Sequence, residues 1–310
     1  MNLLIGIDGG GTKTDFALCR EDGTVLKRVI KPASNPCDIG VDKSVLILKS
    51  GIDELLKDNL TDEVISLFAG ISGGITGNNR EILNAELRKI MGGKVIVNNH
   101  SDVINALSSG IGSDDGCVVI AGTGSIGYGR KNGHFVRVGG YGIHIDKGGS
   151  GYDFGSDALY YALCGKDGRG DDTVLIKMLE EKVGDLVENV GNIINGGKTY
   201  VASFAPLVFE GYRLGDRACI EIVERNAQEI AKIFNALAHF VGADICPVVL
   251  TGGIFKEFDI IKKHLRRHLK FKFRFVIPYL PPVYGSVSEA AFAAGIDTSG
   301  IFKDNFGHTI

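Results

Sequence analysis

Hydrophobic residues near the N-terminus form short runs separated by polar, glycine-rich bends. The run Leu3–Ile7 leads into Asp8-Gly9-Gly10-Gly11-Thr12-Lys13-Thr14, and a second apolar run begins at Phe16. A further turn at Asp22-Gly23 is followed by a third extended segment that reaches Ile30. Short apolar runs bounded by glycine turns are typical of β-strands. The first 30 residues therefore predict three strands joined by two tight turns.

The same pattern recurs in the middle of the chain. An apolar stretch over 117–121 precedes the turn Gly122-Thr123-Gly124-Ser125, a second strand ends near Arg130, and a third covers 135–138. Each copy is followed by chain with helical character, and internal similarity of this kind indicates a repeated structural unit. We expect two related domains that face one another, each offering a glycine turn to a shared cleft.

The remaining apolar pattern predicts further strands that alternate with helices. Strands are expected over 66–71, 94–98, 247–251 and 273–277, and helices over about 39–58, 78–91, 101–110, 150–164, 171–182, 216–242, 256–270 and 286–296. Strands interspersed with helices place the chain in the α/β class.

Composition narrows the class of protein. The 310 residues are 44% hydrophobic and 23% charged, with a formal net charge of −3, so general nucleic-acid binding is not expected. No apolar run approaches the roughly 20 residues that a membrane helix needs, and the N-terminus lacks the features of a signal peptide. Six cysteines without paired or zinc-like spacing indicate reduced thiols, so we expect a cytoplasmic protein with no membrane partner.

The first glycine bend has the chemistry of a phosphate site. Glycines let backbone N–H groups approach a polyanion, hydroxyls and Lys13 can donate to it, and Asp8 can hold magnesium. A plain β-hairpin turn is the alternative interpretation. A P-loop is excluded, because Thr12 separates the last glycine from Lys13 and a strand follows instead of a helix.

Two later glycine bends extend this pattern. Gly122–Gly127 matches the dinucleotide fingerprint in spelling, but the residues after it favour a hairpin over the helix that this fingerprint requires. Gly252-Gly253 follows the strand expected over 247–251 and precedes a helix, so it can bring a ring or a phosphate close to the backbone. A strand-to-helix turn without a ligand is the alternative.

Taken together, the three bends resemble the sugar kinase, actin and Hsp70 superfamily. The resemblance spans nearly the whole chain and implies two ribonuclease H-like (actin-like ATPase) domains with a central cleft. It places one domain at 1–103, with a C-terminal helix at about 288–310 packing back on it, and the other at 104–287. The implied ATP contacts are Asp8, which would also hold magnesium, followed by Gly10, Gly11, Thr12, Lys13, Thr14, Gly122, Thr123, Gly124, Gly252 and Gly253.

Three segments between the bends read Ala33-Ser34-Asn35-Pro36, Gly139-Gly140-Tyr141-Gly142 and Gly148-Gly149-Ser150-Gly151-Tyr152. They resemble the N-acetylglucosamine kinase branch of the BadF/BadG/BcrA/BcrD ATPase family. Asp102 follows a strand and begins a helix, where an aspartate is usually a helix cap. In the sugar kinases of this superfamily an aspartate at that position is the general base. By the same resemblance Asn35 binds sugar hydroxyls and Tyr141 lines the sugar pocket.

The chain departs from this branch at Asp146-Lys147-Gly148. The branch usually carries an acidic residue at the position of Lys147. In this chain the carboxylate nearest to that position in the sequence is Asp146, one residue earlier. A cation there would attract an anionic substituent, such as the lactyl carboxylate of N-acetylmuramic acid. We hypothesise that Lys147, together with His144, extends substrate use to that sugar. The alternative is a surface lysine, with Asp146 replacing the missing acid.

The resemblance implies an ATP- and Mg²⁺-dependent kinase for the 6-hydroxyl of an N-acetylated amino sugar, forming homodimers. Glucosamine or a hexose remains an alternative substrate. A non-kinase ATPase of the BadF/BadG type is a further alternative, although its iron–sulfur relatives carry closely spaced cysteines that this chain lacks.

Overall fold

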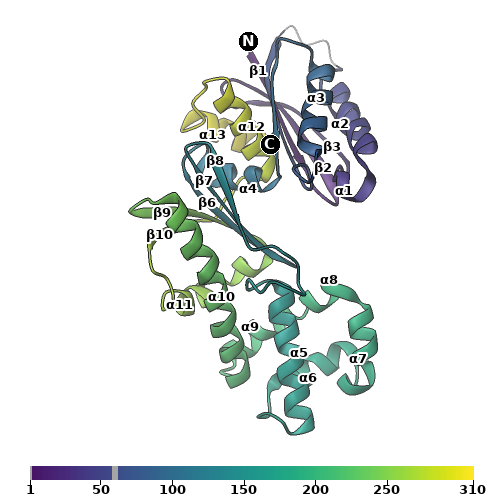
Figure 1. Cartoon of the computed structure of the whole chain (residues 1–310), viewed down its shortest axis with the longest axis vertical. Helices are drawn as coiled ribbons and strands as arrows, with labels where there is room; N and C mark the ends of the chain where they lie inside the picture. Colours follow the sequence, from purple (N-terminus) through teal and green to yellow (C-terminus); the bar gives the residue numbers. More distant parts are fainter. Residues whose placement is uncertain (1, 58–61) are drawn as a thin grey trace. The chain divides into compact units, whose positions relative to one another are not determined.

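The computed structural model describes residues 2–57 and 62–310, which form two compact units (Figure 1). Unit 1 comprises Met1–Asp114 and Ile277–Ile310, and unit 2 comprises Asp115–Val276. Each unit is built around a five-stranded mixed sheet.

Unit 1 opens with the three predicted strands and continues as alternating helices and strands. Its sheet has the order β3-β2-β1-β4-β5, in which β1 is antiparallel to β2 and parallel to β4. The elements are β1 (Asn2–Gly9), β2 (Lys13–Arg20), β3 (Val25–Pro32), α1 (Pro36–Ile39), α2 (Val41–Leu55), β4 (Glu63–Ile71), α3 (Asn79–Met91), β5 (Ile96–His100), α4 (Val103–Ile111), α12 (Pro282–Ala293) and α13 (Ile301–Thr309).

Strand β1 lies at the centre of this sheet and is buried on both faces. Leu3, Ile5 and Ile7 pack in one hydrophobic cluster with residues of α2 and α3, whereas Leu4 packs in another with residues of α12. Side chains alternate between the two faces of a strand, so Asp8 shares the face of Leu4 with α12 and α4.

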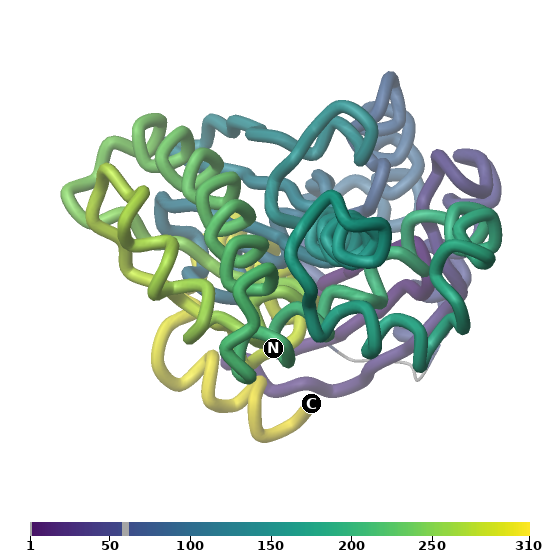
Figure 2. Tube along the Cα trace, turned by 90° about the horizontal axis from the view of Figure 1, so that it is seen from below, coloured from purple at the N-terminus to yellow at the C-terminus, as the bar shows by residue number. Residues whose placement is uncertain are grey.

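The C-terminal segment packs against the N-terminal strands. In Figures 1 and 2 the yellow C-terminal helices lie beside the purple strands. Thr309 accepts a hydrogen bond from the backbone of Val25 at 2.9 Å, and Asn305 donates to the carbonyl of Asp22 at 2.9 Å. Gly6 allows α12 to approach, since a Cβ there would lie 2.6 Å from the backbone nitrogen of Val287.

The unit boundaries differ from those expected from the sequence. Helix α4 and residues 277–287 belong to unit 1, so its limits lie near 114 and 277 instead of 103 and 288. The C-terminal segment, expected as one helix at about 288–310, contains the end of α12, which begins at Pro282, and α13. Helix α12 packs on both α4 and β1, which explains why these segments stay together.

Unit 2 repeats the topology of unit 1. Its sheet has the order β10-β9-β6-β7-β8, so that three antiparallel strands are again extended by two parallel ones. The elements are β6 (Gly116–Ala121), β7 (Ser125–Lys131), β8 (His134–Val138), α5 (Gly151–Asp167), α6 (Val174–Val183), α7 (Leu186–Asn195), α8 (Gly197–Ala202), α9 (Ala205–Arg213), α10 (Arg217–Val241), β9 (Ile245–Thr251), the 3-10 helix η1 (Gly253–Glu257), α11 (Phe258–Leu265) and β10 (Lys272–Val276). The internal repeat predicted from the sequence is confirmed.

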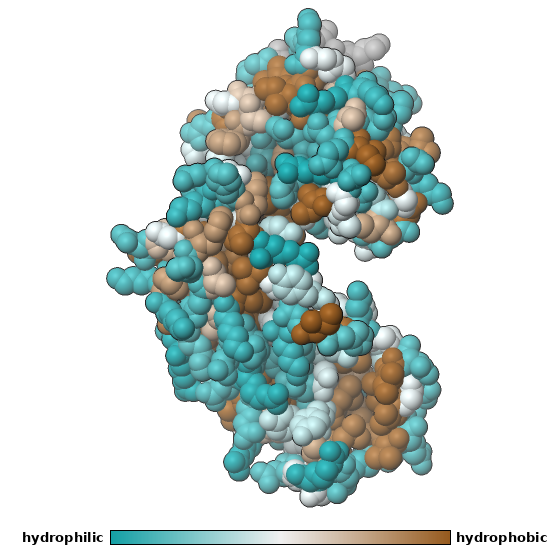
Figure 3. Space-filling model, viewed as in Figure 1, coloured by the Kyte–Doolittle hydropathy of each residue, from teal (hydrophilic) through white to brown (hydrophobic). Residues whose placement is uncertain are grey.

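The three helices between α6 and α10 are the main feature that was not predicted from the apolar pattern. Helices α7, α8 and α9 occupy 186–213, between the helices expected at 171–182 and 216–242. These helices are short, and the pair Gly196-Gly197 separates the first two. Figure 3 shows apolar residues gathered over α7, where Val187 and Ile194 are exposed.

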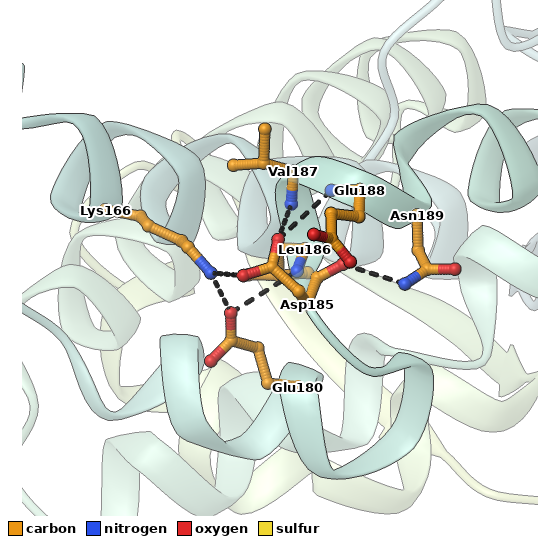
Figure 4. Close-up of polar contacts among 7 residues, drawn as sticks. All are labelled: Lys166, Glu180, Asp185, Leu186, Val187, Glu188 and Asn189. Atoms are coloured by element: carbon orange, nitrogen blue, oxygen red, sulfur yellow. Dashed lines mark hydrogen bonds and ion pairs between the residues drawn. The ribbon is translucent and has the colours of Figure 1, made fainter.

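An ion cluster joins α5, α6 and the start of α7 (Figure 4). Lys166, near the end of α5, pairs with Glu180 of α6 and with Asp185, the N-cap of α7. Asp185 also accepts hydrogen bonds from the backbone of Val187 and Glu188 at 2.9 and 3.1 Å. The cluster therefore fixes where α7 begins relative to α5.

Helix ends differ from the predictions by several residues. The helix expected over 256–270 divides into η1 and α11, and α11 ends at Leu265, within the basic run. The helix expected over 39–58 begins after α1 and ends at Leu55, and residue 58 lies outside the described residues. Within 2–57 and 62–310, no helix has the length and apolar character needed to cross a membrane.

Candidate functional site

Asp8, near the end of β1, is a partly buried carboxylate held by a single side chain of α4. Its Oδ1 accepts a hydrogen bond of 2.6 Å from Nδ2 of Asn105. Burial raises the pKa of Asp8 to about 6, the hydrogen bond opposes this rise, and the negative charge of Asp102 adds to it. Asp8 and Asp102 are therefore close enough for their charges to interact.

Asp102 occupies the N-cap position of α4, but its side chain makes no capping hydrogen bond. The hydroxyl of Ser101 donates to its Oδ1 at 3.1 Å, and the hydroxyl of Ser72 donates to the same carboxylate. Burial raises the pKa of Asp102, while these hydroxyls oppose the rise. The result is an oriented carboxylate that is not used to cap its helix.

His100 precedes this aspartate and is neutral. Its Nδ1 accepts a hydrogen bond from the backbone of Ser101 at 2.8 Å, and burial lowers the pKa of His100 to about 4. It therefore adds no positive charge beside Asp102 at neutral pH.

The first glycine bend is a tight turn between β1 and β2. The backbone N–H of Gly10 donates to the carbonyl of Lys13 at 2.9 Å, and the residues Gly11, Thr12 and Lys13 are exposed. Exposed backbone and side-chain donors at a turn can meet an anion.

Thr14 does not belong with this exposed group. Its side chain is fully buried, and its hydroxyl donates to the carbonyl of Pro32 at 2.8 Å. The hydroxyl of Thr14 is thus used inside the β2–β3 pair, so a contact between Thr14 and phosphate stays a prediction that its side chain does not support.

Asn35 caps the short helix α1. Its Oδ1 accepts from the backbone of Cys37 at 2.9 Å, and its Nδ2 donates to Asp38 at 2.7 Å. Asp38 lies beside the first glycine turn, since a Cβ on Gly11 would be 3.8 Å from its Oδ2. Asn35 is therefore near that turn, with part of its hydrogen-bonding capacity already used.

Unit 2 contains a pocket of about 540 Å³ that brings the other two glycine bends together. Gly122 and Thr123 line it from the turn after β6, and Gly253 lines it from the turn after β9. Helix α9 contributes apolar groups from Ala205 and Phe209, and α8 contributes Ala202. Gly124 and Gly252 belong to the same turns but do not line the pocket.

The start of α5 fixes the second glycine bend in place. The backbone N–H groups of Gly151 and Tyr152 donate to the carbonyls of Gly122 and Thr123 at 2.7 and 3.1 Å. Ser150 caps this helix in a capping box with Asp153. The first helical N–H groups, which lack partners within a helix, are therefore used to hold the pocket wall.

Gly252 and Gly253 have different reasons to be glycine. Gly252 has a φ of 101°, and a Cβ there would lie 2.3 Å from the carbonyl oxygen of Ala121. At Gly253 a Cβ would meet no atom within 4 Å. The backbone requires the first glycine, whereas the second leaves open space at the pocket.

This contrast predicts opposite effects for two substitutions. We expect Gly252→Ala to lower the free energy of unfolding by about 1–3 kcal/mol. The alanine would have to adopt a positive φ, and its Cβ would clash with the backbone of Ala121. Gly253→Val should keep the melting temperature within about 2 °C, which is less than 1 kcal/mol, and weaken ATP binding by about tenfold. Thermal melts and calorimetric ATP titrations of both variants check this. Unchanged ATP binding in folded Gly253→Val would contradict a nucleotide role for this pocket.

The loop after β8 gathers the remaining predicted sugar contacts. The backbone N–H of Tyr141 donates to Oδ2 of Asp146 at 3.2 Å, and the guanidinium of Arg137 lies 5.2 Å from the ring centre of Tyr141. Tyr141 is 63% exposed, and His144 and Lys147 are also exposed. The loop that carries Tyr141, His144 and Lys147 is thus an accessible surface of unit 2. It holds both an acidic residue, Asp146, and a basic one, Lys147.

The structure therefore groups the predicted residues by unit. Asp8, Asp102, Asn35 and the first glycine turn lie in unit 1, and the pocket and the Tyr141 loop lie in unit 2. Asn105, Ser72 and Ser101 were not predicted. Asn105 follows Asp102 by three residues, so its helical spacing could have indicated a shared helix face.

Comparison with known proteins agrees with this fold and places the chain in a family. The profile of the BadF/BadG/BcrA/BcrD ATPase family matches residues 5–287. A structure from Chromobacterium violaceum, provisionally assigned as an N-acetylglucosamine kinase, aligns with a TM-score of 0.67 and 25% identity, covering 92% of this chain and 97% of that one. The two five-stranded sheets are ribonuclease H-like domains of the actin-like ATPase fold.

Two curated proteins are similar over most of their length. N-acetyl-D-glucosamine kinase of Dictyostelium discoideum is 31% identical over 286 residues, covering 86% of this chain and 90% of that protein. N-acetylmuramic acid/N-acetylglucosamine kinase of Clostridium acetobutylicum is 31% identical over 287 residues, covering 88% and 92%. The chain belongs to the BadF/BadG/BcrA/BcrD ATPase family.

Proposed function

We propose that the protein is an ATP-dependent amino-sugar kinase that transfers the γ-phosphoryl group of ATP to the 6-hydroxyl of N-acetylglucosamine. The observation that carries this proposal is Asp102, an oriented carboxylate at the start of α4 that does not cap its helix. The two curated relatives described above act on N-acetylated amino sugars by name, which supports the choice of acceptor.

Asp102 is the proposed general base. It accepts the proton of the sugar hydroxyl as that oxygen attacks the γ-phosphorus. The hydroxyls of Ser101 and Ser72 hold the carboxylate in one orientation, and its raised pKa makes it a better proton acceptor than an exposed aspartate. Phosphoryl transfer depends mainly on positioning and charge neutralisation, so the reaction needs no protein nucleophile beside a well-placed base.

Asp8 is the proposed magnesium-binding carboxylate. Carboxylate oxygen suits Mg²⁺, and the charge of Asp102 disfavours ionised Asp8 in the absence of a cation. A bound magnesium ion would neutralise charge on the phosphate oxygens. The exposed Gly11–Lys13 turn would donate backbone and side-chain N–H groups to the same phosphates.

The pocket of unit 2 is the proposed nucleoside site. Its volume of about 540 Å³ is within the range of small-ligand pockets. Gly122 and Thr123 would lie against phosphate, and Gly252 and Gly253 would form the turn beside adenosine. Ala205 and Phe209 offer apolar surface to a base.

A coupled ADP-release assay tests the proposal against its alternatives. We expect ADP release to depend on N-acetylglucosamine and to be weaker with glucosamine, N-acetylmannosamine or glucose. Faster ADP release with glucosamine or glucose than with N-acetylglucosamine would mean that this other sugar is the acceptor. Equal ADP release with and without every sugar would favour a non-kinase ATPase.

The Tyr141 loop is proposed to contact the sugar, together with Asn35. We propose that Lys147 and His144 attract the lactyl carboxylate of N-acetylmuramic acid, while Asp146 stays bonded to the loop backbone. Lys147 is exposed, so its charge is available to a ligand.

Lys147→Glu provides the test of this second acceptor. Reversing the charge should lower kcat/KM for N-acetylmuramic acid by about tenfold or more, equivalent to about 1.4 kcal/mol. The value for N-acetylglucosamine, which has no carboxylate, should change less than about twofold. Lys177→Glu, a reversal on the exposed face of α6, is a matched control. An unchanged ratio between the two sugars would contradict the role of Lys147.

We further propose that the enzyme works in the cytoplasm, where ATP is available, and that it forms homodimers. Light scattering on a sizing column tests the second point, and a mass of one chain at micromolar concentration would contradict it.

A further inference from the structure

Asn105 is a buried residue of α4 whose side chain donates a hydrogen bond to Asp8. It lies on α4, three residues after Asp102, and its side chain is completely buried. Its Nδ2 lies 2.6 Å from Oδ1 of Asp8, 3.0 Å from the carbonyl of Gly70 and 3.5 Å from the carbonyl of Ile7.

The orientation of this amide is determined by its neighbours. Three acceptors surround Nδ2, so the opposite assignment would place Oδ1 against oxygen atoms. In the actual orientation Oδ1 is buried without a hydrogen-bond partner among the described residues. A buried acceptor without a partner is unfavourable, so hydrogen bonding by Oδ1 does not explain an asparagine here.

Close packing prevents Asn105 from moving away. A Cβ on Gly70 would lie 2.0 Å from its Oδ1, and a Cβ on Gly285 would lie 1.9 Å from its backbone carbonyl. The two glycines let the side chain sit between β4 and α12 in one position. The carbonyls of Ile7 and Gly70 belong to paired strands, which leaves Asp8 as the acceptor that most needs this donor.

We propose that Asn105 is a positioning residue that holds the carboxylate of Asp8 in place for a divalent cation. This inference rests on the proposed function, in which Asp8 binds magnesium. The amide fixes one carboxylate oxygen and ties Asp8 to the helix that begins with Asp102. Partners that orient a metal-binding group commonly contribute 10–100-fold to metal affinity or activity.

The test compares Asn105→Leu with the wild-type protein. Leucine has a similar volume but no donor, and Asn105→Ala is the second variant in case leucine packs poorly. Ser109→Ala is the matched control, because Ser109 is also buried on α4. Its hydroxyl donates a hydrogen bond within the same helix, to the carbonyl of Ala106 at 2.8 Å. Electron paramagnetic resonance of Mn²⁺ titrated into the full chain with a non-hydrolysable ATP analogue reports cation affinity without turnover.

We expect Mn²⁺ affinity and kcat to fall about 10–100-fold in the Asn105 variants. The KM for N-acetylglucosamine and the metal-free affinity for the ATP analogue should stay within about twofold, as should every value for Ser109→Ala. Wild-type Mn²⁺ affinity in a folded Asn105 variant would overturn the proposal, as would an equal loss in Ser109→Ala. Failure of both Asn105 variants to fold would assign Asn105 a structural role instead.

The outcome is separable from that of the proposed function. If the wild-type protein phosphorylates no amino sugar, the kinase proposal fails. The Mn²⁺ titration then still shows whether Asn105 supports cation binding at Asp8.

Discussion

Asp102→Asn is expected to lower kcat by about 10²–10⁴-fold while calorimetric ATP affinity stays within about twofold. The loss corresponds to about 3–5 kcal/mol of barrier and is typical of removing a general base. Asparagine keeps the shape of the side chain and still accepts from the hydroxyls of Ser101 and Ser72. It cannot accept the proton of an attacking hydroxyl, so the chemical step is affected selectively.

The control for this prediction is Asp42→Asn. Asp42 is an exposed acid in the first turn of α2, another helix of unit 1. Its replacement also removes a carboxylate from a helix start, and we expect kcat to stay within about twofold. If Asp102→Asn retains more than about a tenth of the wild-type kcat, Asp102 is not the base.

Asp8→Asn is expected to make the protein more stable and less active. Burial and the neighbouring charge of Asp102 raise the pKa of Asp8 from 3.8 to about 6. At 1.36 kcal/mol per pH unit, keeping Asp8 ionised in the folded state at pH 7.5 costs up to about 3 kcal/mol. Asparagine avoids this cost, so the melting temperature should rise by roughly 5 °C. Activity should fall about 10–100-fold, because the cation loses its carboxylate.

The pH dependence of the stability gain identifies its cause. Asp8 binds its proton more tightly in the folded protein than in the unfolded chain. Protonation of Asp8 therefore stabilises the folded wild-type protein, and this stabilisation is fully present below about pH 4. It is lost as the pH rises through about 6. The difference in melting temperature between the two proteins should therefore be full at pH 7.5 and shrink toward zero near pH 4. A variant no more stable than wild type at pH 7.5 would contradict this account of Asp8.

The hairpins and the repeat could be predicted because their signals are local. Leu3, Ile5 and Ile7 alternate with residues of the other sheet face, and glycine turns mark both ends of the second strand, β2. The same pattern over 117–138 predicted unit 2 correctly. Helices α7, α8 and α9 were not predicted. In α7 the spacing of Leu186, Val190 and Ile193 is a helical signal that the prediction missed. Helix α8 has only six residues, too few for such a pattern to stand out.

The limits of the site prediction have a similar physical origin. Thr14 has the residue type of a phosphate donor, but strand alternation turns its side chain inward toward Pro32. Asn105 is an ordinary polar residue in the sequence, and its role depends on two glycines that are distant along the chain, Gly70 and Gly285. Gly252 and Gly253 are adjacent, yet only their three-dimensional surroundings separate a backbone requirement from open space beside a pocket.

The central claim is that this chain transfers phosphate from ATP to an amino sugar. Phosphorus NMR of the wild-type protein with ATP, Mg²⁺ and N-acetylglucosamine tests it directly. We predict equal amounts of ADP and a sugar 6-phosphate, both formed about 10²–10⁴-fold more slowly with Asp102→Asn. ADP and inorganic phosphate without any sugar phosphate, for this and the other amino sugars, would contradict the claim.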